Sequence, residues 1–89
     1  MAHKAQINIT KGSAERVNQI RQRLKLSQSE FGRLLGVATN TVARWERGDL
    51  NPPKVAEMAA EYLLLLKTKH ETAYLALLMD AARKDKKQQ

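Results

Sequence analysis

Two glycines, Gly36 and Gly48, divide the middle of the chain into segments that have room only for very short helices. Gly36 directly follows a pair of leucines, and Gly48 follows an arginine that ends a mixed polar and apolar run. Glycine is favoured just after the last residue of a helix, because that position commonly takes a left-handed backbone conformation. The pattern predicts one short helix that ends before Gly36 and another, from about residue 39 to 47, that ends before Gly48.

The first of these short helices has a clear start signal. Ser27 is followed three residues later by Glu30, which is the spacing of a capping box, in which each side chain accepts a hydrogen bond from the other residue's backbone N–H. Phe31, Leu34 and Leu35 then form an apolar stripe at helical spacing. The second short helix is expected to bury Val42 and Trp45.

Longer helical patterns flank this central pair. The segment from Ser13, a candidate cap, repeats apolar residues every three or four positions, and another helix is expected from Lys54, after a stiff loop that contains Pro52 and Pro53. Thr68 and Glu71 have capping-box spacing and would start a fifth helix, although one continuous helix over 54–83 is an open alternative. The core faces expected are Val17, Ile20 and Leu24 in the first helix, and Val55, Met58, Ala59, Tyr62 and Leu66 in the fourth.

The whole chain is therefore predicted to be one all-α domain, a compact five-helix bundle with a helix-turn-helix at helices two and three. Residues 1–12 are expected to be a flexible basic arm, residues 13–82 the domain with C-terminal dimerisation helices, and residues 83–89 a basic tail. With 89 residues, 43% of them hydrophobic, the chain can form one small core.

The charge distribution favours a polyanionic partner. The net charge is +7, and the positive charge lies outside the most apolar stretch: residues 13–53 carry seven basic and four acidic side chains, whereas residues 54–82 carry three basic and four acidic ones. A surplus of this kind in a small domain is typical of proteins that bind nucleic acid.

Several function classes find no support in the sequence. The absence of cysteine excludes a disulfide scaffold, a thiolate zinc site and a cysteine nucleophile, and fits a cytoplasmic protein. His3 and His70 lack ligand spacing, so no metal is expected, and no Gly-rich phosphate loop or paired carboxylates suggest an enzyme or a cofactor. No signal-peptide segment or membrane span is expected.

The helices predicted over Gln28–Leu35 and Thr39–Arg47 fit the helix-turn-helix pattern, in which the second helix enters a DNA major groove. The residues that carry a more specific pattern are Leu26-Ser27-Gln28, Leu34-Leu35-Gly36-Val37, Thr41-Val42, Trp45-Glu46-Arg47-Gly48 and Asn51-Pro52. Over about residues 13–66 the chain strongly resembles the helix-turn-helix family of phage Cro and repressor proteins, also called the xenobiotic-response-element family. The resemblance implies a five-helix domain, mostly dimeric, that recognises operator DNA.

The resemblance also implies roles for individual residues. The implied base contacts are Thr39, Asn40 and Arg44, the implied phosphate contacts are Gln28, Arg47 and Lys54, and the implied ion pair between the first and third helices is Arg21 with Glu46. Asn40 and Arg44 are four residues apart, hence on one helix face, and their side chains can pair with adenine and guanine respectively. The chain departs from the family at Ala38, where Ser or Thr is usual, and at Asp49, where relatives often carry a basic residue.

The leading hypothesis is a sequence-specific double-stranded DNA-binding transcriptional regulator that acts as a homodimer on a (pseudo)palindromic operator. The alternative is an antitoxin that binds its toxin and represses its own operon. The four leucines from 63 to 66 and the apolar residues after them exceed what one core face needs, so the dimer interface is predicted there, although a helix that folds back as the core of a monomer remains an alternative. The residues assigned to this interface are Leu63, Leu66, Tyr74, Leu75 and Leu78.

Overall fold

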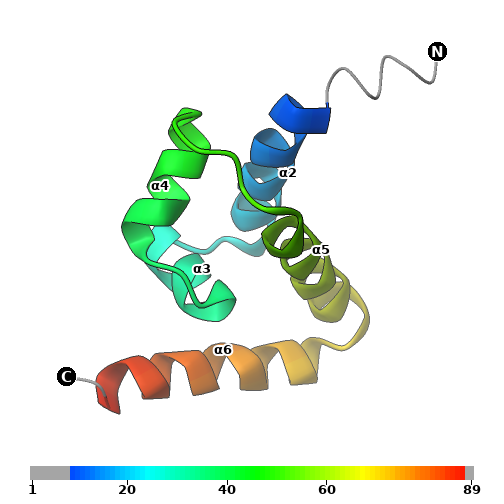
Figure 1. The fold of residues 1–89 in the computed structure, drawn as a ribbon. Helices are drawn as coiled ribbons and strands as arrows, with labels where there is room; N and C mark the ends of the chain where they lie inside the picture. Colours follow the sequence, from blue (N-terminus) through cyan, green and yellow to red (C-terminus); the bar gives the residue numbers. More distant parts are fainter. Residues whose placement is uncertain (1–8, 88–89) are drawn as a thin grey trace.

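The computed structural model describes residues 9–87, which form five α-helices and no β-strand (Figure 1). In chain order the helices are α2 (Ile9–Leu24), α3 (Gln28–Leu35), α4 (Thr39–Arg47), α5 (Lys54–Lys69) and α6 (Glu71–Lys87). The predicted all-α, five-helix fold is confirmed. The last two helices are separate, because the backbone leaves the helical conformation at His70 (φ −141°, ψ 66°).

The two central helices begin and end at the predicted signals. The Ser27 hydroxyl accepts a hydrogen bond from the Glu30 backbone N–H at 3.0 Å, and the Ser27 N–H donates to the Glu30 carboxylate at 2.8 Å. Gly36 (φ 78°) and Gly48 (φ 85°) are left-handed at the C-terminal ends of α3 and α4. Ala38 stands at the N-cap of α4 and forms no side-chain cap, because it has no oxygen to offer.

The N-terminal helix starts earlier than the sequence suggested. Helix α2 begins at Ile9, so residues 9–12 are helical rather than part of an arm, and residues 1–8 lie outside the described residues. Ser13 is therefore inside the helix and does not cap it. It is buried, and its hydroxyl donates to the Glu57 carboxylate on α5 at 3.1 Å. This contact between helices is invisible in a local pattern.

The C-terminal helices also depart from the expected ends. Thr68 belongs to the last turn of α5, where its hydroxyl donates to the Leu64 carbonyl at 2.8 Å, so it forms no capping box with Glu71. Helix α6 continues to Lys87, so the predicted tail is helical over residues 83–87, and residues 88–89 lie outside the described residues.

Residues from every helix form one hydrophobic core. Its buried members are Val17, Ile20, Leu24, Leu26, Phe31, Val42, Trp45, Ala56, Ala60, Leu63 and Tyr74. The predicted core face of α2 is confirmed, and so are Val42 and Trp45. Helix α6 lies across α3 and α5, at the bottom of Figure 1, and Tyr74 is its buried residue.

The predicted core face of α5 is wrong at Val55, Met58 and Tyr62, whereas Ala59 is half-buried and Leu66 packs against the core as expected. Val55, Met58 and Tyr62 are 76%, 61% and 60% exposed, and the buried residues of α5 are Ala56, Ala60 and Leu63 instead. Small residues on a buried helix face permit close packing, and α5 packs against α2. Met79 on α6 is also exposed.

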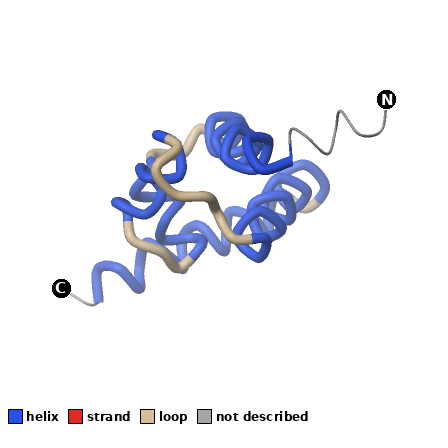
Figure 2. The backbone as a smooth tube through the Cα atoms, turned by 45° about the horizontal axis from the view of Figure 1, so that its top comes forward, coloured by secondary structure: helices blue, strands red, loops and turns tan. Residues whose placement is uncertain are grey.

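The loops place the helices relative to one another. Figure 2 shows the longest of the described loops, residues 48–53, crossing from the end of α4 to the start of α5. Pro52 is buried within this loop, which fits its role as a stiff connection. No helix within residues 9–87 combines the length and the apolar character that a membrane span requires.

Candidate nucleic-acid interface

The exposed side of α4 carries a polar and basic ridge. Asn40, Arg44 and Arg47 follow one another at intervals of four and three residues, so their side chains line one face of the helix, and all three are exposed. The opposite face holds Val42 and Trp45, which are fully buried. Burial of one face therefore leaves the other face, with its amide and guanidinium groups, available to a partner. Thr39 is also exposed, in the first turn.

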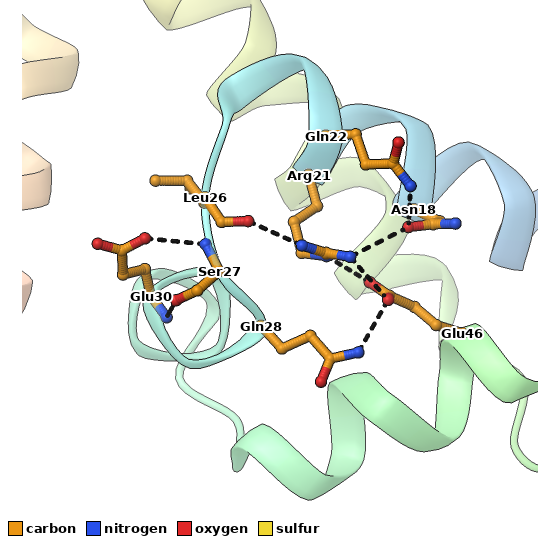
Figure 3. A network of polar contacts seen from close by, with 8 residues as sticks. All are labelled: Asn18, Arg21, Gln22, Leu26, Ser27, Gln28, Glu30 and Glu46. Atoms are coloured by element: carbon orange, nitrogen blue, oxygen red, sulfur yellow. Dashed lines mark hydrogen bonds and ion pairs between the residues drawn. The ribbon is translucent and has the colours of Figure 1, made fainter.

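A nine-residue helix is not stable alone in water, so tertiary contacts must hold α4 in place. The strongest polar contact is an ion pair between Arg21 of α2 and Glu46 of α4 (Figure 3). The Arg21 Nε donates to Glu46 Oε2 at 2.6 Å, and its Nη2 donates to Glu46 Oε1 at 3.0 Å. The side chains are only 18% and 11% exposed, so this two-pronged pair is largely shielded from water.

The same carboxylate also binds α3. Gln28, the first residue of α3, donates from its Nε2 to Glu46 Oε1 at 2.9 Å, and Arg21 donates from its Nη1 to the Leu26 carbonyl at 2.8 Å. Figure 3 shows Arg21 and Gln28 converging on Glu46 from two different helices. Three helices are thus joined at one carboxylate, which ties α4 to both α2 and α3.

Sequence reasoning missed the Gln28–Glu46 hydrogen bond and the part played by Asn18. The Asn18 side-chain oxygen accepts from Gln22 Nε2 at 3.1 Å and from Arg21 Nη2 at 3.5 Å, the same nitrogen that donates to Glu46 Oε1. Gln28 and Glu46 are eighteen residues apart, so no helical spacing relates them. Only the packing of α3 on α4 brings them together.

The three residues assigned to phosphate have different surroundings. Gln28 is half-buried and already bound to Glu46, with its side-chain oxygen directed away from that carboxylate (Figure 3). Arg47 donates from its Nε to Asp49 Oδ2 at 2.9 Å. Lys54, at the start of α5, is exposed, and its Nζ lies 3.9 Å from a Glu57 carboxylate oxygen. Arg44 forms no side-chain hydrogen bond or ion pair with any described residue.

Two of the residues assigned to a dimer interface lie inside the core. Leu63 and Tyr74 are buried in the core, because the inner faces of α5 and α6 supply the cover that the small core of α2 to α4 needs. Leu66 and Leu78 are half-buried against that core, and Leu75 is exposed.

The apolar surface that is exposed lies on the outer face of α5. It consists of Val55, Met58, Tyr62 and Leu65, here called the α5 stripe, which repeat at intervals of three, four and three residues. A shallow groove runs along it, between Lys54 and Leu65. Among residues 13–83, whose side chains the structure describes, no group of three His, Asp or Glu is placed to hold a metal ion.

Comparison with known proteins agrees with this geometry. A helix-turn-helix family model matches residues 17–62, which run from the middle of α2 to the middle of α5 and make up just over half of the chain. Searches of curated proteins and of solved structures found no match. The matched residues include both helices of the motif, the turn at Gly36 and the Arg21–Glu46 pair. The chain belongs to the Cro/C1-type, or xenobiotic-response-element, family of helix-turn-helix proteins, a family of DNA-binding transcription regulators.

Proposed function

We propose that this protein is a sequence-specific regulator of transcription that binds a (pseudo)palindromic operator as a homodimer. The observation that carries the proposal is the ridge of Asn40, Arg44 and Arg47 on the face of α4 opposite its buried residues. A helix of this size fits the major groove, where an amide can pair with adenine and a guanidinium with guanine. Thr39, Asn40 and Arg44 read bases in this arrangement, and Gln28, Arg47 and Lys54 contact phosphates.

Selection of bound sequences from random duplex DNA, followed by footprinting, tests this proposal. We expect one enriched half-site that occurs twice with two-fold symmetry. Asn40→Ala and Arg44→Ala should each cost about 1–3 kcal/mol of binding free energy and relax the preference at one position per half-site. No enriched sequence, or variants that keep the wild-type affinity and the same selected sequence, would refute this docking of α4.

The homodimer is proposed to form through the α5 stripe, since Leu63 and Tyr74 are not accessible. The alternation of three- and four-residue intervals is the spacing that lets one helix pack along another, and four large side chains in this pattern leave substantial apolar surface in water. Acids and a lysine flank the stripe on α5, so the surface is not dominated by one sign of charge. A dimer with recognition helices about 34 Å apart would match one turn of DNA.

Light scattering decides whether the stripe holds a second copy. We expect a dimeric wild type, and a monomer for the double variant Met58→Glu/Leu65→Glu, which places charges within the stripe. Leu77→Glu is the matched control, because Leu77 is an exposed leucine on α6, outside the stripe. A monomeric wild type, or a charged double variant that stays dimeric and binds palindromic DNA normally, would exclude this interface.

A further inference from the structure

One arginine of the polar and basic ridge on α4 is paired with an acidic residue. Arg47 donates from its Nε to Asp49 Oδ2 at 2.9 Å, and the two side chains are 58% and 52% exposed. The Arg44 side chain, one turn earlier on the same face, forms no hydrogen bond or ion pair with any described residue. The two guanidinium groups of the ridge are therefore not equally available to a partner, because Asp49 pairs with Arg47 and not with Arg44.

The turn after α4 holds Asp49 in this position. Gly48 takes a left-handed conformation (φ 85°), which reverses the chain, and the Asp49 backbone N–H donates to the Arg44 carbonyl at 2.9 Å. The acid is thus anchored through its backbone to the last turn of the helix whose arginine it contacts. The backbone at the end of α4 therefore fixes the position of Asp49, whose short side chain contacts Arg47.

We propose that Asp49 is an affinity-limiting residue that withholds Arg47 from DNA phosphate. The inference rests on the proposed DNA-binding function and goes beyond it, because it assigns a negative contribution to a residue beside the interface. Binding a phosphate exchanges one exposed ion pair for another, so the net gain from Arg47 is small. Asp49 also contributes a negative charge that opposes the approach of the DNA backbone.

The size of the effect follows from the exposure of the pair. An exposed ion pair is worth less than about 1 kcal/mol, so its removal should tighten binding by about two- to fivefold per protomer. Because an uncompensated guanidinium releases more counterions from DNA, the slope of log K against log salt should steepen by up to about 0.9 per protomer. Sequence preference should not change, since phosphate contacts read no bases.

Asp49→Asn is the informative substitution. It removes the charge but keeps a side-chain oxygen that can accept from the Arg47 Nε, so the orientation of the guanidinium is retained. Glu71→Gln is the matched control. It also removes one acid with a basic neighbour, Lys67 at 3.8 Å, but on α6, which packs against α3 and α5. Both variants raise the net charge by one.

The experiment measures fluorescence anisotropy of a labelled mixed-sequence DNA duplex between about 50 and 200 mM salt, with the intact chain. We expect Asp49→Asn to bind more tightly than both wild type and Glu71→Gln. We also expect most of that gain to disappear in an Arg47→Gln background. Circular dichroism verifies that each variant is folded.

Four results would overturn the inference. Equal gains for Asp49→Asn and Glu71→Gln would show that only net charge matters. A full gain in the Arg47→Gln background would show that Asp49 acts on phosphates without Arg47. Weaker binding by Asp49→Asn would show that the acid positions the arginine for DNA. A wild type that binds no duplex at all would remove the proposed function, and this inference with it, whereas the first three results leave that function intact.

Discussion

Replacing Glu46 by glutamine keeps the shape of the side chain and removes the charge that joins three helices. The carboxylate accepts two hydrogen bonds from Arg21 and one from Gln28. A glutamine has a single acceptor oxygen, so at least one N–H of the Arg21 guanidinium would face an amide NH₂ group. A buried donor without an acceptor costs about 1–3 kcal/mol. Because the pair retains 18% and 11% exposure, we expect a loss of about 2 kcal/mol of unfolding free energy.

Urea and thermal unfolding, followed by circular dichroism, measure this loss. A change of that size in a domain of this length lowers Tm by about 8–16 °C. Asp49→Asn is the matched control, since it also neutralises an acid bound to an arginine, but at an exposed site where less than about 1 kcal/mol is expected. Equal losses for the two variants would refute the conclusion that the shielded network stabilises the fold more than an exposed ion pair does.

A double variant measures how strongly the stability contributions of Arg21 and Glu46 depend on each other. Arg21→Met with Glu46→Leu removes both charges together, so no unpaired charge is left inside the protein. We expect it to lose less stability than the sum of Arg21→Met and Glu46→Leu measured singly. Additive losses would show that the two side chains contribute independently.

Three further predictions concern stability. Gly32→Ala should destabilise by about 1–3 kcal/mol in urea unfolding, because a Cβ there would lie 2.7 Å from the Val37 backbone oxygen; a neutral change would contradict the tight α3–α4 turn. Hydrogen bonds from Arg16 lower the pKa of Glu61, so this exposed pair stabilises the fold above the ordinary pKa of 4.5 and stabilises it less as the pH falls below that value. Glu61→Gln should therefore have a slightly lower unfolding free energy than wild type at pH 7, and this difference should shrink in acid. A difference that stays constant with pH would argue against the ion pair. Lys25 is left-handed (φ 58°), so Lys25→Gly should stabilise by roughly 1 kcal/mol, and a lower Tm would show that the lysine side chain matters more than its backbone.

The features that the sequence predicted well are local ones. The capping box of Ser27 and Glu30, and the glycines that end α3 and α4, act within a few residues of chain, so spacing alone reveals them. The family resemblance followed from the same segment, and the matched residues 17–62 contain it. The missing cap at Ala38 was also visible, because a side chain without oxygen cannot accept a hydrogen bond.

The features that the sequence predicted poorly depend on contacts between distant residues. Helix α5 has apolar side chains on several faces, so periodicity could not decide which face is inside. Packing decides it, and the core takes the small residues Ala56 and Ala60 together with Leu63. The larger residues Met58 and Tyr62 are displaced to the surface. Leu63 and Tyr74 were assigned to an interface because an excess of apolar residues indicates that some apolar surface must be buried by a partner. The excess does not show which of these residues the core itself buries.

The way α4 is held explains how a recognition helix can lack a cap. Its first residues receive no side-chain support from Ala38, yet its C-terminal half is fixed by the burial of Val42 and Trp45 and by the Glu46 network. Helix ends fray most easily where neither a cap nor packing holds them, so order in α4 is expected to decrease from its C-terminus toward Asn40. Binding in a DNA groove would then order the end of α4 that carries Thr39 and Asn40, while Glu46 holds the other end against α3. The C-terminal half of α4 would thus set the orientation of the helix, and its first turn would be ordered by the contacts of Thr39 and Asn40.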